Sequence, residues 1–566
     1  MNSFRFIRSR LYQDAPRSFL SLVSFMVTAL LVGTPAYAQD KTEEIDELFA
    51  WVTPEAPGCA VAVSQNGEGV VNRAYGLANL ETEAPIGPST MFDIGSVQKQ
   101  FVAAAVLLLV EEGHLALSDD IREHIPELPD YGHEITLDHL LTHTSGVRDW
   151  VSLSNFSSEE EDALTMILRQ RGLNFAPGEE WSYSNSNYVL LKEIVARTSG
   201  MSFSAFTRTR LFEALGMDHT IYAADIRAAK NGAHAYEKEN DLWKPAMMLG
   251  DERGGGAVLS TVSDLLIWNK ALSSARLGTF VTEKLQEPAR LNNGRELSYA
   301  RGLFVGTSPF GRVIWHTGSA RAYKALLSRI PEHGLSIAML CNAGETAERN
   351  MARRRIADLF LPEPAAQKPE AAEPAADADG TGMQDIDVSS KAGFFFNTRT
   401  GEPLRLVVHD GGLRVDRGPV LIPITENRFH HTEGRLSFMS EDEFELHFLS
   451  PDQFVLTSME GKTTQYRRAQ PYAPTAPERQ AFVGRYESDD LRAILEIASD
   501  DNGLTIRLNG SRPFEFKPID RDVFQLGPMM ARFRRDENGK VVTLDYSNPV
   551  LRNITFTRLS NDPSDH

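Results

Sequence analysis

The chain has 566 residues and a formal net charge of -19, with 42% hydrophobic and 24% charged residues. One hydrophobic core rarely serves a chain of this length, so we expect about two to four domains. The hydrophobic and charged fractions are ordinary for globular proteins. The acidic balance argues against nucleic acid or an anionic membrane surface as the binding partner.

The N-terminus has the pattern of a secretory signal peptide. Four arginines precede an apolar run from Phe19 to Val32, and Ala36-Tyr37-Ala38 forms a small-residue cleavage site. The apolar run is short for a membrane span. We therefore predict a signal peptide at residues 1–38, no membrane span after its cleavage, and a periplasmic or secreted protein; a retained N-terminal anchor is the alternative.

The only two cysteines, Cys59 and Cys341, each lie in an apolar, strand-like run. Export would permit a disulfide between them, but free cysteine is commonly buried as a small apolar residue, so we expect two buried thiols. Neither cysteine has C-x-x-C spacing, and no H-E-x-x-H motif occurs. No metal or organic cofactor is implied.

The first catalytic candidates are Ser96 and Lys99. A helical pattern at residues 42–51 and a hairpin with an Asn66-Gly67 turn precede them. An apolar run then predicts a buried helix that begins at Ser96, with Lys99 one turn later on the same face. The free N–H groups and the dipole of a helix N-terminus suit an oxyanion. Because an S-x-x-K pattern is common by chance, later segments must decide its meaning.

A polar loop at residues 175–188 precedes a predicted helix at 189–198. Tyr183 and Asn185 are two residues apart in this loop, so their side chains can face the same way. The alternative is a capping Asn beside a packed Tyr. We expect Thr136 to cap an earlier helix, and His143, which follows that helix, to bond backbone groups rather than act in catalysis.

Strands are predicted at residues 299–306, 313–317, 323–330 and 334–342, followed by a helix to Phe360. The second of these strands ends in His316-Thr317-Gly318, whose small residues would let it approach a ligand closely.

The C-terminal part differs in composition and in its pattern of predicted strands. Residues 362–385 are rich in Pro, Ala and Glu and predict a linker. Beyond it, short alternating strands form a repeat of about 90 residues, which favours two tandem antiparallel barrels. The repeat is carried by Gly393, Gly412, Pro423 and Phe429, which recur as Gly484, Gly503, Pro518 and Phe524.

Three motifs now stand in chain order: Ser96-x-x-Lys99, Tyr183-x-Asn185 and His316-x-Gly318. Together they resemble the serine β-lactamase and penicillin-binding-protein superfamily, of the peptidase family S12 type. The resemblance is to the branch with tyrosine in the second motif, which contains D-aminopeptidases and esterases. The His-x-Gly motif followed by two barrels is closest to the D-aminopeptidase architecture.

The resemblance implies a role for each motif residue. Ser96 would be the acylated nucleophile, Lys99 its base or proton relay, and Tyr183 the partner that protonates the leaving group. Which of Lys99 and Tyr183 is the general base stays open. Asn185 would orient Lys99 and the substrate amide, and the N–H groups of Ser96 and Ser319 would form the oxyanion hole.

One departure concerns the third motif. Many β-lactamases and D,D-peptidases have a lysine at the position of His316, and that lysine attracts a substrate carboxylate. Neutral histidine makes a weak anchor. Arg321 is a candidate replacement, and a solvated strand-end charge is the alternative. The resemblance also implies that the barrels restrict access to the site.

These observations predict an α+β fold: an antiparallel sheet flanked by helices with a helical subdomain, followed by two small antiparallel β-barrels. The expected function is an exported serine hydrolase acting through a Ser96 acyl-enzyme on D-amino-acid amides, short peptides or small esters. The alternatives are a β-lactamase or D,D-carboxypeptidase and, in another class, a non-catalytic ligand-binding sensor. The sequence carries no signal for oligomeric state. The predicted segments are a signal peptide (1–38), the β-lactamase-like domain (39–361), the linker (362–385) and barrels at 386–472 and 477–562.

Overall fold

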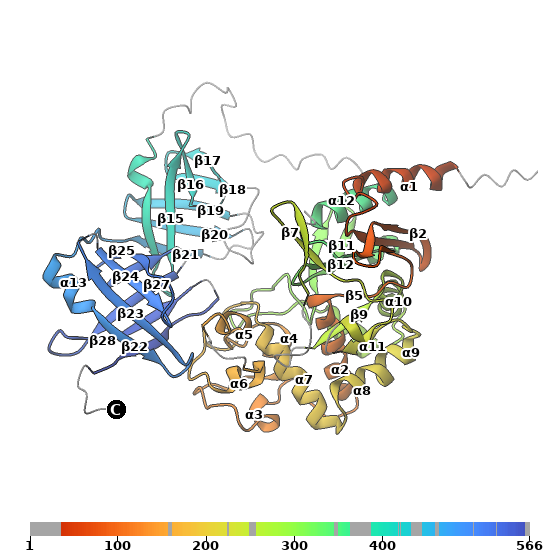
Figure 1. Cartoon of the computed structure of the whole chain (residues 1–566), viewed down its shortest axis with the longest axis horizontal. Coiled ribbons are helices and arrows are strands. Elements are labelled where there is room, and N and C mark those ends of the chain that lie inside the picture. Colours follow the sequence, from red (N-terminus) through yellow and green to blue (C-terminus); the bar gives the residue numbers. More distant parts are fainter. Residues whose placement is uncertain are drawn as a thin grey trace, which may run out of the picture.

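The structure is a computed structural model that describes residues 36–156, 161–223, 226–247, 256–344, 349–362, 387–416, 418, 420–431, 444–458, 463–501, 503–527, 529–548 and 550–560. An α+β domain is followed by two closed antiparallel barrels (Figure 1). This confirms the predicted fold class and order of domains. The predicted signal peptide and linker lie outside the described residues, except for their edges at 36–38 and 362.

The α+β domain is built on a six-stranded antiparallel sheet in the order β10-β11-β12-β13-β1-β2. The β1–β2 turn holds Asn66 and Gly67 at φ values of 52° and 78°, as the predicted hairpin requires. The strand expected at 299–306 begins only at residue 304, because Gly302 has a φ of 77° and interrupts it. The strands are β1 (Cys59–Gln65), β2 (Glu68–Tyr75), β10 (Phe304–Ser308), β11 (Gly311–Ala320), β12 (Tyr323–Ile330) and β13 (Leu335–Cys341).

Helices cover both faces of this sheet. Two of them, α1 (Ala36–Leu48) and α12 (Arg349–Phe360), pack on one face, while α2 (Lys99–Glu111) and α10 (Val262–Ser273) share the larger core on the other. The 3-10 turn η1 (Gly95–Gln98) leads into α2. The other helices are α3 (Ile121–His124), α4 (Leu137–Leu141), α5 (Trp150–Leu153), α6 (Ala163–Leu168), α7 (Asn185–Ser199), α8 (Phe203–Thr207), α9 (Glu213–Leu215) and α11 (Thr279–Gln286).

Short strands border the main sheet of this domain. They are β3 (Leu77–Asn79) with β4 (Ala84–Pro85), β5 (Phe92–Asp93) with β9 (Ala257–Ser260) and β6 (Ile221–Ala223), and the hairpin β7 (Tyr236–Glu239) with β8 (Leu242–Pro245). Thr136 caps α4 as predicted, since its side chain accepts a hydrogen bond from the His139 N–H.

Each barrel closes by pairing its first strand with its last, β14 with β21 and β22 with β29. The predicted repeat is visible in the backbone, because the register shifts at equivalent places, after Pro423 and after Pro518. The first barrel contains β14 (Gly393–Asn397), β15 (Pro403–His409), β16 (Gly412–Val415), β17 (Val420–Thr425), β18 (Arg428–His431), β19 (Phe444–Ser450), β20 (Gln453–Ser458) and β21 (Thr463–Arg468). The second follows α13 (Ala476–Phe482) and contains β22 (Gly484–Ser488), β23 (Ala493–Asp500), β24 (Gly503–Leu508), β25 (Phe514–Asp520), β26 (Val523–Leu526), β27 (Met529–Arg535), β28 (Val541–Ser547) and β29 (Ile554–Arg558).

The second barrel packs against the α+β domain through an apolar contact. Leu153, Phe156 and Met166 belong to the same buried cluster as the interior of this barrel. The rings of Phe156 and Tyr546 meet edge to face at 5.0 Å between centroids. The second barrel thus shares one apolar core with this part of the α+β domain.

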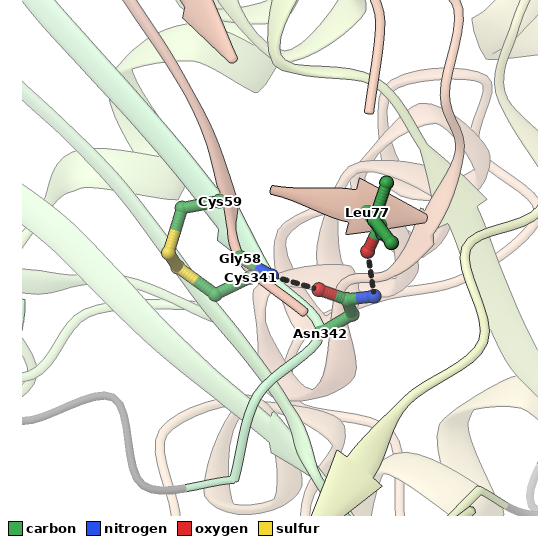
Figure 2. The surroundings of a disulfide bond; sticks show 5 residues. All are labelled: Gly58, Cys59, Leu77, Cys341 and Asn342. Carbon is green, nitrogen blue, oxygen red and sulfur yellow. Dashed lines mark hydrogen bonds between the residues drawn. A yellow bond between two sulfur atoms is a disulfide. The ribbon is translucent and has the colours of Figure 1, made fainter. Parts of the chain in front are cut away.

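Cys59 and Cys341 form a disulfide, so the expectation of two free thiols was wrong (Figure 2). The two residues face each other across β1 and β13 with Cα atoms 4.0 Å apart. The next pair along, Gly58 and Asn342, is joined by a backbone hydrogen bond, which makes the cysteines a close, non-hydrogen-bonded pair. The Asn342 side chain also accepts from the Gly58 N–H and donates to the Leu77 carbonyl (Figure 2).

We expect the double variant Cys59→Ala, Cys341→Ala to lose stability, because the disulfide joins positions 282 residues apart and restricts the unfolded chain. The expected loss in free energy of unfolding is about 2–5 kcal/mol, measured by denaturant titration. An unchanged unfolding midpoint would contradict a structural role for this bond.

Candidate active site

Ser96 and Lys99 lie on the same face of the turn that opens helix α2. The turn is 3-10 in character, and in that geometry residues i and i+3 eclipse each other. The Lys99 Nζ donates a hydrogen bond to the Ser96 Oγ at 3.1 Å. The predicted juxtaposition is therefore present, although the α-helix proper begins at Lys99 rather than at Ser96.

The Lys99 amine is buried and held from several sides. Its Nζ donates to the Asn185 Oδ1 at 2.9 Å and lies 4.7 Å from the centre of the Tyr183 ring. The residue is 4% exposed. Burial lowers the pKa of Lys99 from 10.5 to about 7; the Asp149 carboxylate opposes this shift and the Lys192 cation adds to it. A substantial fraction of the amine is therefore neutral near pH 7.

Tyr183 and Asn185 flank the start of helix α7, which begins four residues earlier than predicted. Ser184 is the residue before its first turn, so Asn185 is helical rather than part of an extended loop. The Asn185 N–H donates to the Asp149 Oδ1 at 2.6 Å, which gives the helix N-terminus a carboxylate. The Asn185 side chain also bonds this carboxylate, and its Oδ1 accepts from Lys99.

The Tyr183 phenol is buried beside the nucleophile. Within the described residues it makes no hydrogen bond of ordinary geometry, although Ser96 is close enough to stabilise its ionised form. Burial outweighs that contact and raises the pKa of Tyr183. The phenol is consequently protonated at neutral pH.

His143 lies behind Tyr183, with ring centroids 4.3 Å apart. Its Nδ1 accepts a hydrogen bond from the Ser184 N–H at 3.2 Å, which confirms the expectation that it bonds a backbone group. Burial is the largest cause that lowers its pKa, and the positive charge of Lys99 adds to it. His143 thus supports the segment that carries Tyr183 and remains neutral.

The third motif lies on β11 against the turn that carries Ser96. The His316 Nδ1 is 2.6 Å from the Thr317 carbonyl, so Nδ1–H donates there and Nε2 is left to accept from the Tyr299 hydroxyl at 3.3 Å. Burial lowers the pKa of His316 to about 3, which makes it a neutral ring. It therefore offers no positive charge, unlike a lysine at the same position.

The backbones of η1 and β11 approach so closely that neither has room for extra atoms. A Cβ atom on Gly318 would lie 1.9 Å from the Ile94 carbonyl oxygen. A Cβ atom on Gly95 would lie 2.7 Å from the Ser319 nitrogen. The peptide nitrogens of Ser96 and Ser319 thus belong to two backbone segments in direct contact.

Arg321 is the one predicted site residue that lies away from the motifs. It is exposed in the β11–β12 turn with a φ of 50°, and its carbonyl accepts from the Lys324 Nζ. Within the described chain, no contact joins its side chain to the other motif residues. This placement agrees with the alternative of a solvated strand-end charge.

The motif analysis missed Asp149, Lys192 and Tyr299. Asp149 binds the Asn185 backbone, and Lys192 and Tyr299 act on Lys99 and His316 respectively. Asp149 and Tyr299 have no helical spacing from a motif residue, so only the fold reveals them. Lys192 lies seven residues after Asn185 on α7, and this spacing could have pointed to it.

The comparison with protein-family models decides the family. The model described as Beta-lactamase matches residues 44–360. The chain belongs to the beta-lactamase family. The predicted resemblance is confirmed, since relatives named penicillin-binding protein and D-aminopeptidase also match this chain.

Among these relatives, penicillin-binding protein 4* of Bacillus subtilis (strain 168) is 30% identical over 351 residues, which cover 57% of this chain and 76% of that protein. A D-aminopeptidase of Gluconobacter oxydans (strain 621H) is 28% identical over 328 residues. That match covers 56% of this chain and 62% of the D-aminopeptidase, less than two thirds of its length.

Two solved structures share the fold. An octameric penicillin-binding protein homologue from Pyrococcus abyssi superposes with a TM-score of 0.50 and 21% identity, covering 76% of this chain and 99% of its own. The crystal structure of SurE with D-Leu also has a TM-score of 0.50, at 18% identity, and covers 93% of this chain and 100% of its own.

We expect Gly318→Ala to lower kcat/KM for any acylating substrate by about 10²-fold or more. The added methyl group would push β11 away from the Ile94 carbonyl and displace the Ser319 N–H, which the resemblance implies as an oxyanion donor. Losing one such donor typically has an effect of this size. Gly69→Ala in β2 is the matched control, because a Cβ atom there has nothing within 4 Å. Equal activity of the two variants would show that the close approach is not needed.

Proposed function

We propose that this protein is an exported serine hydrolase that forms an acyl-enzyme on Ser96. Its substrates in this proposal are D-amino-acid amides, short peptides or small esters. The observation that carries the proposal is the hydrogen bond from a buried, readily neutralised Lys99 amine to the Ser96 hydroxyl. The D-aminopeptidase relative supports the choice of substrate class.

In the proposed acylation step, the Ser96 Oγ attacks the substrate carbonyl carbon while neutral Lys99 takes the hydroxyl proton. The oxyanion accepts hydrogen bonds from the N–H groups of Ser96 and Ser319. Collapse of the tetrahedral intermediate breaks the bond to the leaving amine or alkoxide, which takes the Tyr183 phenol proton. Lys99 then returns a proton to Tyr183, and a water molecule later hydrolyses the ester.

Lys99 is the general base in this scheme. A base works best when its pKa is close to the working pH. Burial brings the pKa of Lys99 to about 7 but raises that of Tyr183. Tyr183 is therefore better suited to donate its proton than to abstract one.

The neutral His316 ring favours substrates without a required carboxylate. A cationic group at this position would attract the carboxylate of a β-lactam or of a D-alanyl-D-alanine terminus, whereas His316 is uncharged across the physiological range. The relatives named penicillin-binding protein keep β-lactamase or D,D-carboxypeptidase activity as the competing proposal.

Export and restricted access complete the proposal. The Cys59–Cys341 disulfide suits an oxidising compartment, and the N-terminal sequence has a secretory pattern. The described helices include none with the length and apolar character needed to cross a membrane. The second barrel, docked on the α5–α6 region, would limit the size of substrates that reach Ser96.

The rate of acylation should rise with pH through an acidic limb near pH 7. Lys99 accepts the serine proton only when it is neutral, and that form predominates above its pKa of about 7. Stopped-flow acylation by a neutral ester between pH 5 and 9 would measure this limb. A rate already at its maximum at pH 5 would contradict the role of Lys99 as base.

Ser96→Ala should abolish both hydrolysis and labelling by acylating probes. The panel would compare a D-alanyl amide, a small ester and a cephalosporin, with covalent adducts located by peptide mass spectrometry. Turnover of the amide or ester supports the proposal, while preferred turnover of the cephalosporin supports the β-lactamase alternative. Turnover that survives in Ser96→Ala would contradict the acyl-enzyme, and binding without turnover in the unmodified protein would point to a sensor.

A further inference from the structure

The second barrel contacts the α+β domain through Asp490, which lies at the turn between β22 and β23. The Asp490 carboxylate accepts from the Arg148 Nη1 at 2.7 Å and from the Arg171 N–H at 3.2 Å. Its carbonyl oxygen accepts from Arg169 at 3.1 Å and from Gln170 at 2.8 Å. One barrel residue thus meets four residues of the α+β domain.

Arg148 is a buried cation at this junction. Its side chain is 3% exposed, against 13% for that of Asp490. Its other guanidinium nitrogen donates to the carbonyls of Arg552 and Asn553, which also belong to the second barrel. A buried cation requires a partner charge, and among the described residues Asp490 is the carboxylate paired with it.

Short contacts connect Arg148 to the catalytic candidates. The Arg148 carbonyl accepts from the Ser186 Oγ at 2.6 Å, and the next residue, Asp149, accepts from the Asn185 N–H. Asn185 in turn accepts from the Lys99 Nζ at 2.9 Å. The position of Arg148 therefore determines where the first turn of α7 holds the Lys99 amine.

The second barrel also contacts the segment that leads directly into α7. Arg552 donates to the Glu180 carboxylate at 3.1 Å, three residues before Tyr183. Glu180 is buried and also accepts from Arg399 of the first barrel at 2.8 Å. Barrel contacts thus lie on both segments that meet at α7.

We propose that Asp490 is a positioning residue for the acyl-transfer site. By neutralising buried Arg148, it holds Asp149 and Ser186 against the start of α7 and keeps Asn185 packed on Lys99. This inference rests on the proposed function for its catalytic meaning, but the structural coupling has a readout of its own. The second barrel then positions residues of the acyl-transfer site, in addition to restricting access to it.

The readout is the pKa of the Lys99 amine, followed by NMR of protein labelled with 13Cε-lysine and assigned with Lys99→Arg. The charged and titratable groups that face this amine are Asp149, Lys192, His143, His316, Tyr183 and Tyr188. Burial is the largest cause of its lowered pKa. A loosened α7 would admit water, so the pKa should rise toward 10.5.

The test compares Asp490→Asn with Arg492→Gln. Arg492 is 60% exposed and pairs at the same interface with Glu161, a carboxylate that also pairs with Arg169. We expect Asp490→Asn to raise the Lys99 pKa by about one unit or more and to lower acylation at pH 7 about fivefold or more. Arg492→Gln should leave the Lys99 pKa and the acylation rate unchanged. Asp490→Glu keeps the negative charge, so both quantities should stay close to those of the unmodified protein.

An unchanged Lys99 pKa in Asp490→Asn would overturn the proposal, even if hydrolysis were lost. If this variant does not fold, Arg148→Lys tests the same coupling from the other side of the pair. Lysine keeps the charge, but its single nitrogen cannot replace both Nη atoms, which bond Gln170, Asp490 and the barrel carbonyls. A shifted pKa in a protein that hydrolyses no member of the panel would support the coupling and contradict the proposed function.

Discussion

The candidate site depends on one interaction: a lysine amine is buried away from water beside a serine hydroxyl. Lys99 has lost nearly all contact with solvent, and its hydrogen bonds go to Ser96 and Asn185. The ring centres of Tyr183 and Tyr188 lie within 5.4 Å of its nitrogen. These rings stabilise an ammonium cation only weakly, and they do not attract water. The position is therefore costly for a charge and favourable for a neutral base.

Backbone contacts, more than side chains, hold the opening turn of α2 in place. Gly302 lies against the Lys99 carbonyl, where a Cβ atom would be 2.7 Å away, and Gly318 lies against Ile94 from the other side. Helix α7 closes the third side through Asn185. The barrels add to this arrangement from outside, since Asp490 and Arg552 hold the two segments that lead to α7. A site built this way leaves no room for a side chain at these glycines.

Local signals in the sequence predicted much of this structure. The Asn66-Gly67 turn, the Thr136 cap and the barrel repeat depend on neighbouring residues, and the motif order predicted which segments meet around Ser96. Contacts between distant segments that carry no motif were not predictable. The Cys59–Cys341 disulfide depends on β1 pairing with β13 across 282 residues. Asp149 and Tyr299 reach the site through the fold alone, and the early start of α7 depends on the Asp149 carboxylate at its N-terminus.

The central claim is that Ser96 carries an acyl group whose carbonyl lies between two backbone N–H donors. A crystal structure of the protein trapped with a slowly hydrolysed acylating compound tests it most directly. The account predicts an ester bond to the Ser96 Oγ, with the carbonyl oxygen about 2.7–3.1 Å from the nitrogens of Ser96 and Ser319. An adduct on another residue, or a carbonyl turned away from both nitrogens, would contradict it.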